Sequence, residues 1–168
     1  MPEQKTLRRA QRDKRQGKAP STQAGEFIRE EIDHIREGKH GARSPQQAIA
    51  IGLSKARRAG VDLPPPAKGM TSAKTRKRAA RDLERGHGAP ARRAATPKRA
   101  QASAQALKRE GSAAASPQAL AKHAHAAASR RSPGQRSESA RKAAQTKGSA
   151  GRSAAARKAA HSREVHAP

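Results

Sequence analysis

The chain has 168 residues, of which 38 are Lys or Arg and 13 are Asp or Glu, giving a formal net charge of +25. Leu, Ile, Val and Phe together number only 14, too few for one large core, and the single aromatic residue excludes a base-stacking platform. Cysteine is absent, which excludes disulfides and thiolate metal sites, and no apolar run approaches the length of a membrane span.

Apolar and basic residues are distributed unevenly along the chain. Nine of the 14 large apolar residues lie between 27 and 63, whereas residues 64–168 carry +19 of the net charge. This pattern predicts a mostly α protein with extensive disorder. We expect a basic flexible arm at 1–20, a helical hairpin at 21–63, and a disordered or nascent-helical polycationic tail at 64–168.

The first expected helix covers about residues 23–37. Its apolar residues recur at helical spacing and form one stripe, and Gly38 is well placed to end it: the stripe consists of Ala24, Ile28, Ile32 and Ile35. An acidic ridge follows the same spacing on the opposite side and consists of Glu26, Glu30, Asp33 and Glu37. We interpret this ridge as a solvated face, with docking of the protein's own tail as the alternative.

The second expected helix begins at Ser44 and runs to about Ala59. Ser44, Pro45 and Gln47 form a Ser-Pro-x-Gln start typical of a capping box, and Gly60 ends the helix before a proline-rich exit. Small residues recur along one side, which predicts close packing against the first helix: Ala48, Gly52 and Ala56. The two helices form an αα-hairpin.

The connection between these helices contains Gly38 and Lys39 and superficially looks like a phosphate-binding loop. A nucleotide P-loop needs Ser or Thr directly after the lysine, and here His40 follows. We therefore interpret it as an interhelical turn. A compatible alternative is that free N–H groups of the second helix, with Lys39 and Arg43, grip a backbone phosphate.

Beyond residue 64 the chain consists of degenerate repeats of about 14–18 residues rich in Ala, Lys, Arg and Ser. Each begins with a residue suited to a helix start and continues with helix formers; the starts are Thr71, Thr96, Ser116, Ser132 and Gly151. Helices this short and this positively charged are marginal in water. We expect them to fold when phosphates neutralise their charge.

The segment "GEFIREEIDHIREGKHGARSPQQAIAIGLSKARRAGVDLPPP" resembles the core of a bacterial family of small basic proteins of unknown function, some of them described as DNA-binding. "GKHGARS" and "QAIAIGLSKARRAG" are its most specific parts; Pro45 stands where the resemblance leads us to expect Thr. The tail is similar in composition to the tails of linker histones and bacterial histone-like proteins. In such tails, elements like Thr96-Pro97-Lys98-Arg99 are associated with the DNA minor groove.

No catalytic constellation is recognisable, so we expect no enzyme activity, no cofactor and no small-molecule substrate. His123 and His125 fall on different helix faces, which disfavours a metal site. The candidate nucleic-acid-binding residues are basic positions in the hairpin and tail: Lys39, Arg43, Lys55, Arg57, Arg58, Lys74, Arg76, Lys77, Arg78, Arg92, Arg93, Lys98, Arg99, Arg130, Arg131, Arg141, Lys142, Arg157 and Lys158.

The expected function is sequence-nonspecific binding and condensation of duplex DNA, in a cytoplasmic, nucleoid-associated protein without membrane contact. One alternative is a protein-interaction or self-association module, such as a homodimer through Phe27 and Ile51, which the tail tethers to nucleic acid. Another is an RNA-binding or ribosome-associated protein, because charge alone does not separate RNA from DNA.

Overall fold

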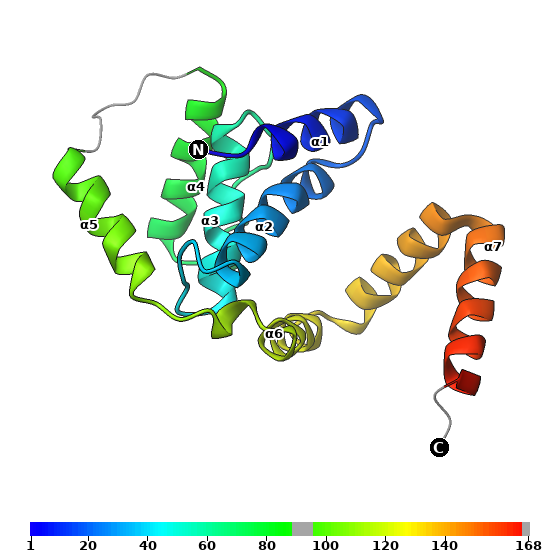
Figure 1. The fold of residues 1–168 in the computed structure, drawn as a ribbon. Helices are drawn as coiled ribbons and strands as arrows, with labels where there is room; N and C mark the ends of the chain where they lie inside the picture. Colours follow the sequence, from blue (N-terminus) through cyan, green and yellow to red (C-terminus); the bar gives the residue numbers. More distant parts are fainter. Residues whose placement is uncertain (89–95, 166–168) are drawn as a thin grey trace. The chain divides into compact units, whose positions relative to one another are not determined.

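The computed structural model describes residues 1–88 and 96–165, and the described chain is mostly helical, with no strand (Figure 1). This confirms the predicted mostly α class; extensive disorder is not shown. The chain divides into two compact units, Met1–His123 and Ala124–Pro168.

Four helices form the body of the first unit: α1 (Gln4–Arg15), α2 (Pro20–Arg36), α3 (Pro45–Arg58) and α4 (Ala73–Gly86). Helix α2 packs on α3, α1 packs on α2, and α4 packs on α3 (Figure 1). The predicted hairpin is thus present as α2 and α3, with a helix added on each side.

Both ends of the hairpin's turn are built as their sequence indicates. Gly38 takes a φ of 72° after α2, and the N–H groups of Gly38 and Lys39 donate to carbonyls of the last helical turn, a Schellman stop that favours glycine. At the start of α3, Ser44 Oγ accepts from Gln47 N–H. The Gln47 side-chain oxygen accepts a hydrogen bond from the N–H of Arg43 and not from that of Ser44. The reciprocal bond of the capping box is therefore displaced by one residue.

The predicted row of small residues lies at the contact between α2 and α3. Ala48 and Ala56 are fully buried, and a methyl group added to Gly52 would lie 2.7 Å from the Cα of Ile28. Two clusters of apolar side chains lie along this contact. One contains Ile32 and Ile35, and the other contains Phe27.

The expected flexible arm at 1–20 is instead largely helix α1. Its Ala10 is buried in the same cluster as Phe27 and Ala24, with Leu7 packed against it. Phe27 has no exposed surface, so its predicted role in a homodimer interface is wrong. The sequence pattern did not predict that α1 packs on α2, because α1 contributes very few apolar residues to the contact.

Part of the expected tail also packs on the hairpin. Helix α5 (Pro97–Lys108), the short 3₁₀ helix η1 (Ala113–Ala115) and α6 (Pro117–Ser129) follow α4. Ala114 and Ala115 are buried in the Ile32 cluster, and Gly41 and Ala42 donate N–H groups to the carbonyls of Leu107 and Gly111. Alanine side chains fill this contact. A count of large apolar residues therefore does not predict it.

The second unit contains the end of α6 and α7 (Pro133–Val165). Helix α7 is interrupted at Gly148, whose φ of 66° and ψ of 175° are not helical. This glycine ends the repeat that starts at Ser132. Helices α4, α5, α6 and α7 each begin one residue after a Ser or Thr, namely Ser72, Thr96, Ser116 and Ser132, so the repeat boundaries correspond closely to the helix starts.

Candidate nucleic-acid interface

The acidic ridge of α2 faces the chain's own N-terminal helix. Glu26 pairs with Arg9 of α1 at 3.6 Å, and Glu30 Oε2 accepts the N–H of Glu3 at 3.1 Å. At its end, Glu37 pairs with Lys39 at 2.9 Å. The ridge therefore is not a purely solvated face, and it docks α1 rather than the tail.

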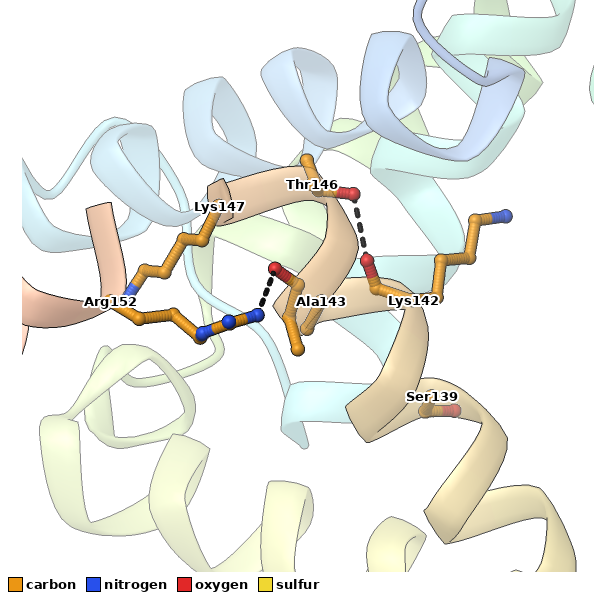
Figure 2. Close-up of a pocket in the computed structure, with 7 residues that line it drawn as sticks. Ser139, Lys142, Ala143, Thr146, Lys147 and Arg152 are labelled. Atoms are coloured by element: carbon orange, nitrogen blue, oxygen red, sulfur yellow. Dashed lines mark hydrogen bonds between the residues drawn. The ribbon is translucent and has the colours of Figure 1, made fainter. Parts of the chain in front are cut away.

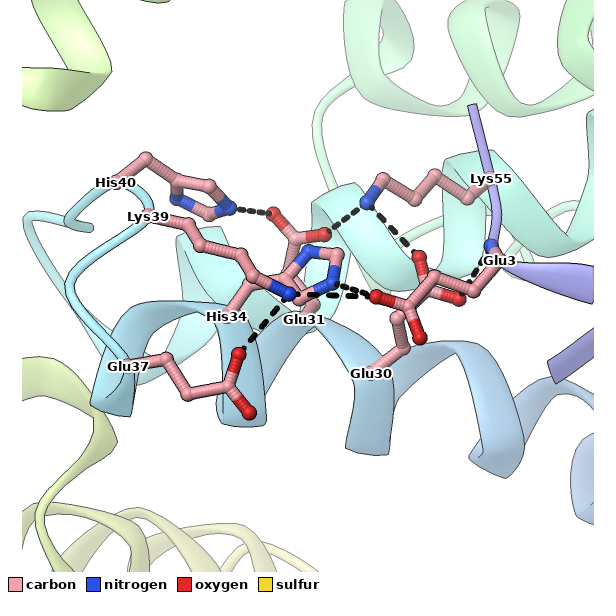
Figure 3. A network of polar contacts seen from close by, with 8 residues as sticks. All are labelled: Glu3, Glu30, Glu31, His34, Glu37, Lys39, His40 and Lys55. Carbon is pink, nitrogen blue, oxygen red and sulfur yellow. Dashed lines mark hydrogen bonds and ion pairs between the residues drawn. The ribbon is translucent and has the colours of Figure 1, made fainter. Parts of the chain in front are cut away.

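Lys55 belongs to a buried ion network at the centre of this arrangement (Figure 3). Its Nζ lies 2.6 Å from Oε2 of Glu31 and 3.4 Å from Oε1 of Glu30. The Glu31 side chain is 1% exposed and that of Lys55 17%. Because breaking such a buried pair leaves an uncompensated charge, Lys55 serves the fold and is not free to contact a phosphate.

Arg57 is also committed to the fold. It is 6% exposed, and its guanidinium donates to the carbonyls of Leu63 and Pro64 at 3.0 and 3.2 Å. Burial lowers the pKa of Arg57, with Asp82 opposing that effect. The side chain holds the proline-rich segment that follows α3. Arg57, like Lys55, is therefore not accessible to a phosphate.

The turn at 38–44 has few free donors for the proposed phosphate grip. The N–H groups of Gly41, Ala42 and Arg43 all donate to groups within the chain. Lys39 is half-exposed and pairs with Glu3 and Glu37; its hydrogen bond to Glu37 is the largest cause of a raised pKa, which burial opposes. Arg43 is 80% exposed, and its Nε and Nη2 both donate to Glu110 Oε1 at 3.4 Å, so it too has an acidic partner.

Helix α4 presents the clearest basic surface of the first unit. Lys74, Lys77 and Arg78 are exposed and Arg76 is half-buried. Two further exposed arginines, which the sequence analysis did not select, extend the surface at i, i+3 and i+4 spacing. We call the resulting row the α4 basic face: Lys74, Arg78, Arg81 and Arg85.

No ion pair involves the α4 basic face within the described part of the chain. The acidic residue of α4 that lies nearest α3, Asp82, turns to the opposite side, where it accepts from Ser54 and lies 3.7 Å from Arg58. Arg58 is therefore partly neutralised, whereas the outward row of α4 is not. The i, i+4 recurrence of basic residues was the sequence signal that would have found Arg81 and Arg85.

The remaining candidates lie on the later helices. Lys98 and Arg99 lie in the first turn of α5, and Arg130 and Arg131 follow α6. The four candidates on α7 are all exposed: Arg141, Lys142, Arg157 and Lys158. Arg92 and Arg93 fall outside the described residues. Over the described residues 124–165 no ion pair occurs, so the cations of the second unit keep their full charge toward solvent.

A hollow lies at the break in α7, where the side chains of Lys147 and Arg152 lie beside each other and the Lys142 ammonium points away from them (Figure 2). Lys142, Lys147 and Arg152 line it. Arg152 donates to the carbonyl of Ala144 at 3.1 Å, and Thr146 Oγ1 donates to the carbonyl of Lys142 at 2.9 Å. The first bond supplies a donor to Ala144, whose usual helical donor would be the N–H of Gly148, and the second is a side-chain bond within the preceding turn.

The fold and charge layout define a small helical protein whose acidic residues are mostly paired within the first unit, whereas the cations of the α4 basic face and of the second unit have no ion pair among the described residues. Residues 3–68, which include α1, α2 and α3, match the model of a family of unknown function (DUF6496). Neither the curated proteins nor the solved structures give a match. None of the helices in the described part of the chain is both long and apolar enough to span a membrane.

Proposed function

We propose that the protein binds duplex DNA without sequence preference and condenses it by neutralising phosphates. The observation that supports this most is the asymmetry of ion pairing. Nine of the 13 acidic residues form ion pairs, and all nine lie in the first unit. The α4 basic face and the cations of the second unit have no such partners among the described residues.

Affinity in this mechanism comes from the release of counterions condensed on DNA. Each phosphate contact adds about −0.9 to the slope of log affinity against log salt concentration on duplex DNA. The unpaired cations lie on helix surfaces with no base-reading pattern, which favours nonspecific contacts to the backbone. Single-strand stacking is disfavoured because the only aromatic side chain, Phe27, is buried.

Condensation requires one molecule to contact more than one DNA segment. The α4 basic face and the cations of α7 belong to different units of the chain, so a single chain carries two basic surfaces. Two linked binding surfaces can bridge two duplexes without a protein dimer. This bridging needs no homodimer through Phe27 and Ile51, and it accounts for the proposed association with the nucleoid.

Fluorescence anisotropy of the full-length protein on labelled duplexes tests the proposal. We expect equal affinity for duplexes of unrelated sequence and a steep salt dependence. Replacing Lys74, Arg78, Arg81 and Arg85 with Gln should make the slope shallower by up to about 3.6, since four contacts are removed. Light scattering of long DNA measures condensation in the same samples.

A matched control tests whether the change in slope depends on where the charges lie or only on how many are removed. Lys5, Arg8, Arg12 and Arg15 form an exposed row at similar spacing on α1, but this helix lies beside the acidic ridge. Replacing these four with Gln removes the same charge and should change the slope less. Equal losses in the two variants would refute the α4 basic face as the interface, and tighter binding to RNA than to DNA would refute the assigned partner.

A further inference from the structure

Three potential metal ligands meet at the end of α2 and in the turn that follows it. Glu31 and His34 lie three residues apart on α2, and His40 lies in the turn that follows (Figure 3). One donor atom from each of the three lies within 4.8 Å of the other two. A Glu-x-x-His pair on a helix places both side chains on one face, an arrangement used by metal-binding helical bundles.

The contacts of His40 are the strongest indication that a cation belongs here. Its Nδ1 lies 3.1 Å from the carbonyl oxygen of Gly41, and its Nε2 lies 3.2 Å from Oε1 of Glu31. A neutral imidazole carries one N–H, so it satisfies one of these oxygens and directs a lone pair at the other. When Nδ1–H donates to the carbonyl, a proton or a metal ion must lie between Nε2 and the carboxylate.

His34 is oriented in the way expected of a metal-binding imidazole. Its Nε2 lies 2.8 Å from Oε1 of Glu3, and a histidine that binds a metal usually donates its other ring N–H to such a carboxylate. With Nε2–H donating to Glu3, Nδ1 of His34 carries the free lone pair. The contact with Glu3 also ties α1 to the same site.

Glu31 is placed to bind through one oxygen while the other is held. Lys55 Nζ forms the ion pair at 2.6 Å with Oε2, although the direction departs from that of a hydrogen bond. Oε1 faces His40 instead. A buried carboxylate that forms an ion pair with a lysine through one oxygen can still bind a metal ion through the other, and carboxylates at metal sites commonly have such supporting contacts.

We propose that Glu31, His34 and His40 form a Zn²⁺ site. Two imidazoles and one carboxylate are a donor set that zinc accepts, and water supplies a fourth ligand. The 3.2 Å between His40 Nε2 and Glu31 Oε1 is close to the separation of about 3.3 Å between ligands of a tetrahedral zinc with bonds near 2.0 Å. Mg²⁺ and Ca²⁺ prefer oxygen ligands and fit this set poorly.

A zinc ion here would fasten the turn at 38–44 to α2. That turn also donates the N–H groups that hold Leu107 and Gly111, so the ion would stabilise the docking of the segment around η1 as well. Its role is structural and is independent of DNA binding. The two proposals therefore succeed or fail separately.

Isothermal titration of the full-length protein with Zn²⁺, in competition with a chromophoric chelator, tests the site. We expect one tight site per chain, a higher midpoint of thermal unfolding with zinc, and visible absorption typical of tetrahedral Co²⁺ when cobalt replaces zinc. His34→Gln and His40→Gln should each abolish the tight phase and the cobalt spectrum. Circular dichroism confirms that these variants keep their helices.

The control removes two of the five histidines that lie outside the proposed site. The double variant His123→Gln, His125→Gln removes two imidazoles from α6, which the structure places outside the site, and it should retain tight binding and zinc-dependent stabilisation. Equal loss in this control, or the absence of tight zinc binding by the wild type, would overturn the proposal. If His40→Gln fails to fold, the result for His34→Gln and the cobalt spectrum of the wild type still decide it.

Discussion

Gly25→Ala and Gly52→Ala are the same substitution at two interior helix positions, and we expect opposite effects on stability. Alanine in place of an interior helical glycine stabilises by about 0.5–1 kcal/mol because it reduces the entropy lost on folding. At Gly25 in α2, nothing lies within 4 Å of the added methyl group. This variant should therefore gain stability.

At Gly52 the added methyl group would meet backbone. It would lie 2.7 Å from the Cα and 3.0 Å from the N of Ile28, and neither atom can move without shifting α2. Forcing a methyl group into a packed contact costs about 1–3 kcal/mol. The free energies of unfolding of the two variants should differ by that steric cost.

Chemical denaturation, followed by circular dichroism and by the NMR signals of amides in α2 and α3, measures this difference. The NMR signals restrict the readout to the first unit, since the helices of the second unit also contribute to the dichroism. Equal stabilisation by the two substitutions would show that α2 and α3 do not approach closely at Gly52. The assigned packing of the hairpin would then be wrong.

Phe27→Ala should destabilise the first unit by about 3–5 kcal/mol, the usual cost of removing a fully buried Phe, and denaturation measures it; a change below about 0.5 kcal/mol would place Phe27 at the surface. The hydrogen bond from His34, and next the contacts of Lys39, lower the pKa of Glu3 below its ordinary 4.5. A lowered pKa contributes stability that is present above 4.5 and is lost as the pH falls through the lowered value. The protection of α1 amides relative to their intrinsic exchange rate should fall over that acidic range in the wild type, whereas Glu3→Gln should remove this part of the pH dependence. Identical profiles would show that Glu3 does not anchor α1.

The local features of the hairpin were predictable from sequence. Ser44 caps α3, Gly38 ends α2, and the small residues around Gly52 mark the closest contact between the helices. Each of these features depends on one residue type that suits a particular backbone or packing geometry, and the neighbouring residues in the sequence are enough to predict it.

Features that depend on distant segments were not predictable in the same way. The alternative of a homodimer through Phe27 and Ile51 requires an exposed Phe27, but Leu7 and Ala10 of α1 cover this side chain, and α1 lies in a segment whose charge indicates disorder. The potential zinc ligands are also split, with Glu31 and His34 on α2 and His40 beyond the Gly38 turn. Their proximity follows from the angle of that turn, which the sequence pattern does not specify.

The glycine that interrupts α7 changes what a long basic helix can reach. Thirty-three uninterrupted helical residues would make a rod about 50 Å long, longer than the 34–36 Å of one duplex turn. A straight helix of that length cannot follow the curved phosphate backbone of a duplex along its whole length. A joint at Gly148 divides it into two rods of about 23–26 Å, and each can align with its own stretch of backbone. In the proposed complex with DNA, the number of cations that contact one duplex would then depend on the backbone conformation of Gly148.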